Sequence, residues 1–435
     1  MFKLGSIFFL LGIVLLIIRK NTYPWPIRRA SDILFLLAAI MGSSAISIAQ
    51  EWRIFSRYSK KVLRGLALIF SGILLASTLH FFLGGVAIDS ESILSLGRFV
   101  EVGIIFLLIG FFQYHDKSFY KKVALAQLST LIYLGVIFLP NNLHIPMYRF
   151  ELFENWPSNV SYYLIVSISL IVVWILHMLK PFKKTFFIYY VAGIGLFATL
   201  LWTQVRASWL AMTIILILIL TLWSLKEYQK KFESFLLGGL IIAALVPLSF
   251  FVLPRNIKNN VLMRSFPQLI DQQTTSHPSA PTELIADIIE KKQLPNLYEA
   301  SRPYLWREYG EKILRQPLGF GLKYPGVTYE GTPRGPHNTP LEILMTGGII
   351  TLTGFLYLWY LSFQNLISMI RTAEDRRWSL YLLTALTGLA IAALFDNMST
   401  FRLMWVVLAL AVYYRPINSP SPILSSGLNF DERDR

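Results

Sequence analysis

The sequence predicts an all-α protein that crosses a membrane many times, and three observations support this fold class. The mean hydropathy is +0.53, and only 15% of the 435 residues are charged, whereas soluble globular proteins carry about 25%. Apolar runs of roughly 18 or more residues, long enough to cross the hydrocarbon core as helices, recur along the chain. Lys and Arg gather in short segments between these runs, as the positive-inside rule requires.

We expect about twelve transmembrane helices, because that many apolar runs of sufficient length can be delimited. The expected ranges are 4–18, 31–49, 63–83, 93–112, 122–139, 160–179, 185–203, 207–225, 234–253, 338–366, 378–395 and 398–414. Residues 1–253 then form an N-terminal transmembrane bundle, 254–337 a long periplasmic loop, and 338–415 a C-terminal set of transmembrane helices. The tail, 416–435, has the composition of a disordered cytoplasmic segment.

The distribution of basic residues predicts which loops face the cytoplasm. Lys and Arg are frequent in 50–64, 113–122, 180–184, 226–233 and 367–377, and such loops stay inside. The long loop 254–337 therefore faces the outside, which is the periplasm in a bacterium. Strict alternation also places the basic segment 19–30 outside. Two explanations remain open: 31–49 is re-entrant, or the arginines of 19–30 have a separate role such as binding lipid phosphates.

Two short amphipathic helices are expected in the periplasmic loop, at 282–293 and 302–315. The second has Ser301 as its N-cap and Pro303 in its first turn. Its apolar face is formed by Leu305, Trp306, Tyr309 and Ile313. A helix of this kind beside membrane spans lies on the bilayer surface or packs on the bundle.

The net charge of +15 and the absence of cysteine restrict the function classes. The positive charge follows from the basic loops between spans, so we expect the lipid bilayer rather than nucleic acid as the partner. Without cysteine the chain has no disulfide framework and no thiolate metal site.

The stretch GTPRGPHNTPLE, residues 331–342, places His337 just before an apolar run. Thr339, Pro340 and Glu342 follow the pattern of a capping box, which predicts that the span begins at Thr339. His337 then lies outside the helix, close to the membrane surface. It is either an ordinary loop histidine or a titratable base at that surface.

Two arginines stand out near the membrane. Arg206 lies between two apolar runs, and a charged residue at a helix centre costs roughly 2.5–3.5 kcal/mol on insertion scales. It is either a snorkelling interfacial residue or part of a functional site. Arg302 opens the second loop helix, where the helix dipole disfavours a cation, so either an anion or solvent compensates it.

Asp396 and Arg402 flank the turn between the last two expected spans and could pair with one another. The expected topology places several polar residues at one membrane face: Arg206, Arg302, Arg334, His337, Asp396 and Arg402. Several cations and one titratable base, without a metal-ligand cluster, are typical of a site for a diphosphate, because arginine binds phosphate oxygens in a bidentate manner.

At these residues the chain resembles the O-antigen ligase family, which belongs with O-antigen polymerases and protein O-oligosaccharyltransferases to a superfamily of bacterial polyprenyl-diphosphate-dependent glycosyltransferases. The resemblance covers roughly 200–360. It rests on Arg206-Ala207-Ser208-Trp209-Leu210, Arg302-Pro303-Tyr304-Leu305-Trp306, Gln316-Pro317-Leu318-Gly319-Phe320-Gly321, and His337-Asn338 with Leu341 and Gly347-Gly348 behind it.

The resemblance implies an inner-membrane enzyme that transfers a glycan from undecaprenyl diphosphate to a sugar hydroxyl of the lipid A core on the periplasmic face. By the same resemblance His337 activates the acceptor hydroxyl, and Arg206 and Arg302 bind the diphosphate. Supporting roles are expected for Arg334, Asn338, Asp396, Arg402 and Trp209. The family implies no metal and no cofactor, and direct displacement at the anomeric carbon predicts inversion of configuration.

Three alternatives to an O-antigen ligase stay open. An O-antigen or capsule polymerase would use the same donor with a second lipid-linked glycan as acceptor. A protein O-oligosaccharyltransferase is less favoured, because no large soluble domain follows the last expected span. A twelve-span transporter or flippase would place ionisable groups deep along a central pathway, whereas these residues lie at one membrane face.

Overall fold

The computed structural model describes residues 2–15, 30–45, 55, 59–84, 90–128, 157–178, 184–203, 205–227, 232–253, 257–258, 261, 302–322, 324–329, 332–372, 376–399 and 401–415. These residues are mostly helical, as the sequence predicts. The labelled elements are α1 (Phe2–Leu15), α3 (Ala30–Ala45), α5 (Lys60–Gly84), α6 (Ser90–His115), α8 (Pro157–Met178), α9 (Lys184–Thr203), α10 (Arg206–Glu227), α11 (Phe232–Val252), β1 (Val327–Tyr329), β2 (Thr332–Arg334), α15 (Thr339–Thr372), α16 (Arg377–Ala393) and α17 (Arg402–Tyr413). Two further helices occupy 119–128 and 302–315.

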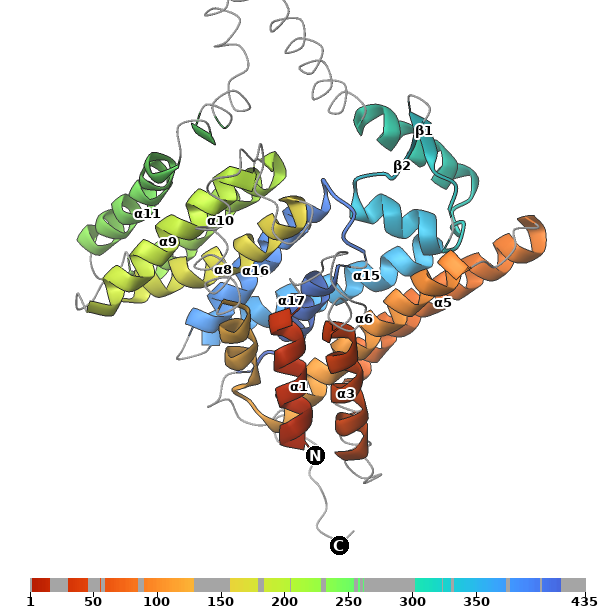
Figure 1. Cartoon of the computed structure of the whole chain (residues 1–435), viewed down its shortest axis with the longest axis horizontal. Coiled ribbons are helices and arrows are strands. Elements are labelled where there is room, and N and C mark those ends of the chain that lie inside the picture. Colours follow the sequence, from red (N-terminus) through yellow and green to blue (C-terminus); the bar gives the residue numbers. More distant parts are fainter. Residues whose placement is uncertain are drawn as a thin grey trace, which may run out of the picture.

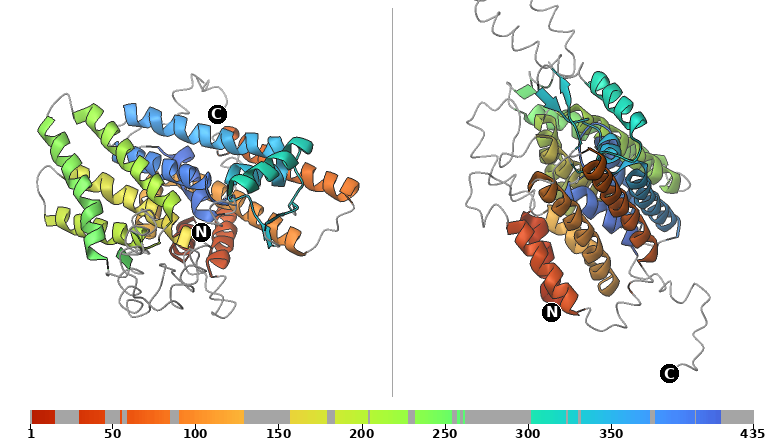
Figure 2. Two further views of the ribbon diagram at one scale, coloured as in Figure 1. Left: turned by 90° about the horizontal axis from the view of Figure 1, so that it is seen from above. Right: turned by 90° about the vertical axis from the view of Figure 1, so that its right-hand side faces the viewer.

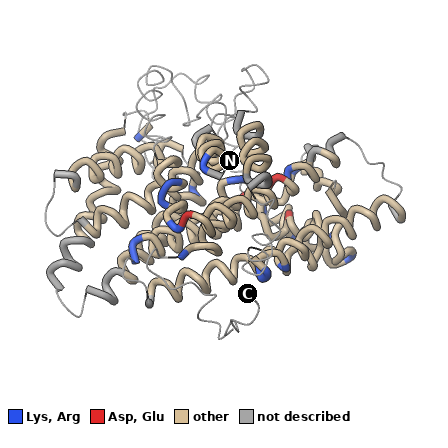
Figure 3. Tube along the Cα trace, turned by 90° about the horizontal axis from the view of Figure 1, so that it is seen from below, with Lys and Arg blue, Asp and Glu red and all other residues tan. Residues whose placement is uncertain are grey.

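Each apolar range expected from the sequence contains one of these helices or part of one. Five described helical segments are long and apolar enough to cross a membrane: Lys60–Phe82, Ser95–His115, Val160–His177, Phe186–Thr203 and Thr339–Ile370. Others are apolar but shorter, so about twelve spans stays a prediction. Charged residues are sparse along the helical trace in Figure 3, which fits a chain with several membrane-spanning helices.

The expected long loop, 254–337, differs in one respect from the expectation. Its second expected helix is present at 302–315, while the first, at 282–293, and the Ser301 cap lie outside the described residues. Sequence reasoning missed the antiparallel hairpin of β1 and β2, in which Val327 pairs with Arg334. The hairpin lies beside helix 302–315 in Figure 1, and together they form a small unit above α15. Its buried residues are Leu305, Tyr309, Val327 and Met345.

The helices form two groups joined by the C-terminal helices. On one side α9 packs against α8 and α11, and α10 packs against α16. On the other side α15 runs along α5, and α17 packs against α6. Figures 1 and 2 show α16 and α17 between the two groups. The C-terminal helices therefore hold the whole arrangement together.

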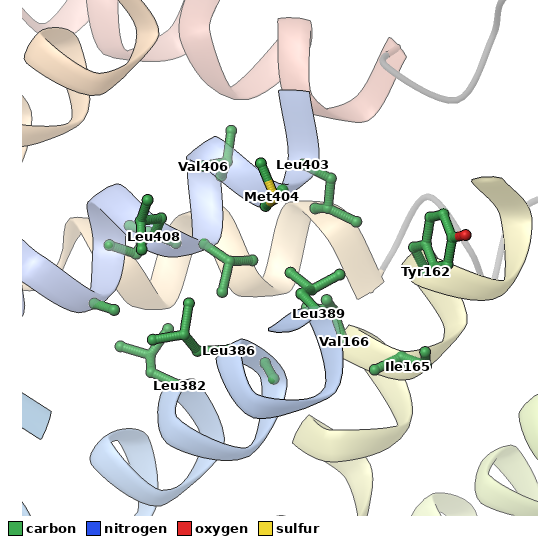
Figure 4. Close-up of a cluster of buried hydrophobic side chains, with 14 of the residues drawn as sticks. Tyr162, Ile165, Val166, Leu382, Leu386, Leu389, Leu403, Met404, Val406 and Leu408 are labelled. Atoms are coloured by element: carbon green, nitrogen blue, oxygen red, sulfur yellow. The ribbon is translucent and has the colours of Figure 1, made fainter. Parts of the chain in front are cut away.

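The centre of the core lies where α8, α16 and α17 meet. In Figure 4 Val166 of α8 lies beside Leu389 of α16, and Ile165 and Tyr162 lie at the same end of the buried cluster. Of the apolar window Val160–His177 in α8, 89% is buried inside the protein. A helix that is apolar all round and buried is an inner helix rather than a lipid-facing one. The N-terminal end of α8 is thereby held firmly, which matters for the site described next.

A break divides α15 at Gly348, which has φ 64° and ψ −163°. The amide of Ile349 bonds to the Pro317 carbonyl at 2.9 Å, and the amide of Phe320 bonds to the Met345 carbonyl at 2.7 Å. The loop after helix 302–315 thus supplies partners for backbone groups that the break removes from the helix. In hydrocarbon such groups must be satisfied within the protein. This joint connects helix 302–315 to α15.

Candidate functional site

His337 occupies the approach to α15 in an unusual backbone conformation. Its φ is 47°, and it is the one non-glycine residue of the described chain with positive φ. Helix 302–315 holds this approach through two side chains: Trp306 Nε1 donates to the Pro336 carbonyl at 2.9 Å, and the Tyr309 hydroxyl donates to the Arg334 carbonyl. A left-handed residue other than glycine costs of order 1–3 kcal/mol and persists where its surroundings impose it. His337 is therefore held in place by its neighbours rather than by local preference.

The first turn of α15 is capped by Asn338, not by Thr339, so the expected capping box is wrong. The Asn338 side-chain oxygen accepts from the Leu341 amide at 3.0 Å, which is the bond of an N-cap residue. Thr339 instead donates to the Asp396 carbonyl at 2.7 Å. The Glu342 carboxylate accepts from the Ser399 amide at 3.2 Å. These side chains bond to the turn between α16 and α17 because that turn crosses directly over the helix start.

Asn338 also joins this turn, because its Nδ2 donates to the Leu394 carbonyl at 2.9 Å. Its backbone amide donates to Asn397 Oδ1 at 3.1 Å. The start of α15 and the turn 394–401 therefore form one hydrogen-bonded unit. Asn338, expected only as support, positions His337 through the backbone on its C-terminal side.

The Asp396 carboxylate faces His337. His337 Nδ1 lies 3.8 Å from Asp396 Oδ1, which is longer than a formed hydrogen bond; such catalytic contacts often tighten only in the substrate complex. The Asn397 amide donates to Asp396 Oδ1 at 2.8 Å, and the Tyr162 hydroxyl donates to Oδ2 at 2.5 Å. Burial raises the pKa of Asp396, but its interaction with the nearby His337 ring and the hydrogen bonds from Tyr162 and the Asn397 amide outweigh burial and leave this pKa below its ordinary value.

Arg402 does not pair with Asp396, contrary to one expectation from the sequence. Its Nε lies 2.8 Å from Glu101 Oε1, and its Nη2 donates to Glu101 Oε2 at 2.8 Å. This ion pair joins α17 to α6, and both side chains are largely buried. Arg402 therefore braces the end of the turn that carries Asp396. Glu101 lies inside an apolar run, where an acidic residue is by itself a signal of function or pairing.

Arg302 begins helix 302–315, one helical turn before Trp306, which bonds the approach to His337. Its Nε is buried and has no hydrogen-bond partner among the described residues. A buried guanidinium N–H without a partner is costly, and an anion would satisfy it. The structure thus brings the helix of Arg302 and the segment of His337 into direct contact.

Arg206 is the first residue of α10 and its side chain is exposed. Two residues later, Ser208 Oγ lies 2.5 Å from Ser161 Oγ of α8, and the next residue of α8 is Tyr162, the partner of Asp396. A short series of contacts thus connects the start of α10 to the His337 region. Trp209 has a local role, because its Nε1 donates to the Leu200 carbonyl at 3.2 Å across the turn between α9 and α10.

Arg334 lies at the end of β2, three residues before His337, and its side chain is partly buried. Its carbonyl accepts from Tyr309, so its backbone is fixed by helix 302–315. Within the described ranges no group of three His, Asp or Glu residues could hold a metal ion. The expectation of a metal-free site remains a prediction for experiment.

The arrangement can perform base chemistry beside an anion. Asp396 lies on the Nδ1 side of His337, so an Nδ1–H directed at the carboxylate leaves Nε2 unprotonated as the base. The carboxylate would also stabilise the imidazolium that forms when this base takes a proton. Sequence reasoning missed Tyr162 and Glu101. A tyrosine at the start of an apolar run is commonly an interfacial residue, so nothing local distinguished Tyr162.

A comparison with protein families supports the resemblance seen in the motifs. Residues 191–356 match the family model described as O-antigen ligase. This stretch contains Arg206, Arg302 and His337, whereas Tyr162, Asp396 and Arg402 lie outside it.

The chain is also similar to a Rickettsia felis protein described as a candidate polysaccharide ligase, with 27% identity over 205 residues. That match covers 39% of this chain and 46% of the other protein, so it spans less than half of the relative's length. The resemblance drawn from the motifs is confirmed as a match of residues 191–356 to the O-antigen ligase model, which covers less than half of the chain.

Proposed function

We propose that the protein is an O-antigen ligase that transfers a glycan from undecaprenyl diphosphate to a sugar hydroxyl of the lipid A core. The family match and the similarity to a candidate polysaccharide ligase support the coarser class, a ligase- or polymerase-type glycosyltransferase in a membrane. The observation that carries the proposal is His337, held beside Asp396 at the start of α15 with the helix of Arg302 packed on the same approach.

In the proposed reaction His337 Nε2 takes the proton of the acceptor hydroxyl. The acceptor oxygen forms a bond to the anomeric carbon, and the bond from that carbon to the diphosphate oxygen breaks. The electron pair leaves with the diphosphate, whose growing charge Arg206 and Arg302 stabilise. Direct displacement inverts the anomeric configuration. No step needs a metal or a cofactor, and the site would face the periplasm from the bacterial inner membrane.

The first test is the variant His337→Ala, assayed with lipid-linked glycan and lipid A-core acceptor. A positioned base contributes roughly 10²–10⁴-fold, so transfer should fall by about that factor while the protein stays folded. Chelator should leave the activity of the wild-type protein intact. Normal capped lipopolysaccharide from His337→Ala would contradict the catalytic role, and activity lost to chelator and restored by Mg²⁺ would contradict a metal-free reaction.

A polymerase is the second candidate, since it would use the same base and the same donor. Deleting the gene and separating the lipopolysaccharide on a gel distinguishes the two. Loss of all capping with accumulation of lipid-linked polymer supports a ligase, and a core bearing a single repeat unit supports a polymerase. A transporter or flippase would leave purified protein unable to join donor to acceptor.

A further inference from the structure

Tyr162 contributes a buried ring and a single directed hydroxyl at the N-terminal end of α8. The side chain is 1% exposed, and its ring lies 5.5 Å from that of Phe401. In Figure 4 the ring lies at the end of the cluster formed by α8, α16 and α17, and the hydroxyl points away from the apolar side chains. The ring is fixed by packing, so the position of the hydroxyl is determined by the core.

Because of that hydroxyl, the two carboxylate oxygens of Asp396 have different partners. Oδ2 accepts from Tyr162, while Oδ1 accepts from the Asn397 amide and faces His337 Nδ1. With one oxygen bonded to the core and the other to its own turn, the carboxylate cannot rotate freely. Oδ1 is the carboxylate oxygen that lies 3.8 Å from His337 Nδ1.

The neighbouring residue links the same end of α8 to α10. Ser161 Oγ and Ser208 Oγ are both buried and lie 2.5 Å apart, and Ser208 is two residues after Arg206. Two consecutive residues of α8 therefore contact the two parts of the site, the carboxylate at His337 and the helix that begins with Arg206.

We propose that Tyr162 is a positioning residue of this active site, whose hydroxyl orients the Asp396 carboxylate toward His337. The inference rests on the proposed function, because it assigns Tyr162 a role in the action of His337 as base. Ser161 extends the role of α8 by keeping the start of α10 at a set distance. In the general arrangement, a base is oriented by a neighbouring polar group. Here Asp396 would orient His337, and Tyr162 would orient Asp396.

The charged and titratable groups around Asp396 determine how the loss of this hydroxyl would act. They are His337 from the approach to α15, Tyr162 from α8 and Glu342 from α15, with Arg402 of α17 engaged by Glu101 of α6. Removing the Tyr162 hydroxyl takes one donor from the carboxylate, so the pKa of Asp396 rises. This change moves the acidic limb of activity to higher pH.

The test is Tyr162→Phe, which keeps the ring and removes only the hydroxyl. We expect roughly 10-fold lower kcat, in line with the loss of one hydrogen bond to a charged group, and an acidic limb displaced to higher pH. Tyr163→Phe is the matched control. Tyr163 is also buried in α8, at 5% exposure, and its ring lies 5.6 Å from that of Phe401. Removal of the Tyr163 hydroxyl should leave the pH dependence of activity unchanged.

A double-mutant cycle separates positioning from general damage. If Tyr162 acts through Asp396, then Tyr162→Phe should reduce activity little further in an Asp396→Asn background. Equal reductions in both backgrounds, or an unshifted pH profile for Tyr162→Phe, would overturn the inference while leaving His337 as base. Full activity of His337→Ala would overturn the proposed function and this inference with it, so the two failures are distinguishable.

Discussion

The His337 side chain depends on residues that are distant in sequence. Trp306 fixes the carbonyl before it, Asn338 caps the helix after it, and Asp396 faces its ring. The first two contacts fix the backbone on either side of His337, and Asp396 lies next to its ring. The imidazole therefore has little freedom to move. In the proposed reaction, this preorganisation would let His337 act as a base on a sugar hydroxyl, because no reorganisation is needed when charge develops.

Arg206 provides a prediction at the residue scale. Arg206→Lys should reduce transfer nearly as much as Arg206→Ala, because a compact ammonium cannot reproduce the bidentate contact of a guanidinium with a diphosphate. Arg307→Lys is the matched control. Its side chain is 74% exposed and contacts Glu311 on the surface at 3.5 Å, so activity should be unchanged. The measurement is the rate of glycan transfer at saturating acceptor. Full activity of Arg206→Lys would contradict a role in diphosphate binding and indicate that Arg206 only extends its charge to the membrane interface.

Among the elements, the broken helix α15 determines how the two parts of the site are joined. The loop of Pro317 to Phe320 bonds to both sides of the break at Gly348. A Cβ at Gly348 would lie 2.5 Å from the Leu318 carbonyl oxygen, and one at Gly319 would lie 2.5 Å from the Gly348 amide nitrogen. Backbone meets backbone at this joint, and only glycine permits the contact. Helix 302–315 is thereby attached rigidly to α15.

Gly348→Ala should therefore destabilise the protein. The backbone conformation of Gly348, with φ 64° and ψ −163°, is essentially restricted to glycine and costs an alanine of order 1–3 kcal/mol, and the clash with Leu318 adds to this. Gly310→Ala is the control, because Gly310 lies within helix 302–315 with nothing within 4 Å of an added Cβ. It should be neutral or stabilise by up to about 1 kcal/mol. Thermal unfolding in detergent checks the pair, and equal melting temperatures for the two variants would contradict the role of the joint.

For the whole molecule, the question is which side of the membrane holds the site. The positive-inside rule places the loop of Lys117 in the cytoplasm and helix 302–315 in the periplasm. The chain has no cysteine, so single cysteines can be labelled without a background. Arg307 and Lys117 are both exposed, which makes Arg307→Cys and Lys117→Cys a suitable pair.

A membrane-impermeant maleimide should label Arg307→Cys in intact spheroplasts. Lys117→Cys should react only after the membrane is disrupted. Both variants should retain transfer activity, which shows that the labelled protein is correctly folded. Labelling of Lys117→Cys alone in intact spheroplasts would reverse the proposed orientation and place the site on the cytoplasmic side.

Local patterns in the sequence account for the helices and for the main candidate residues. Apolar runs predict helices because burial of a helix in lipid or protein needs only a continuous stretch of suitable side chains. The helix at 302–315 and the position of His337 before α15 follow from proline and periodicity signals of the same local kind. The motif resemblance, confirmed as a family-model match over 191–356, implies roles for Arg206 and Arg302 that local patterns leave open and that stay predictions.

Only the tertiary structure decided which side chains meet. Asn338 caps α15 in place of Thr339 because the turn 394–401 lies over the helix start and engages Thr339 and Glu342. Arg402 bonds Glu101 because α17 packs on α6, and Tyr162 reaches Asp396 across 234 positions of sequence. Such pairings depend on how helices pack. Hydropathy and motif spacing along the sequence do not indicate which helices become neighbours. The sequence by itself determined where His337 lies, and the packing of α8 on α16 and of α17 on α6 decided what surrounds it.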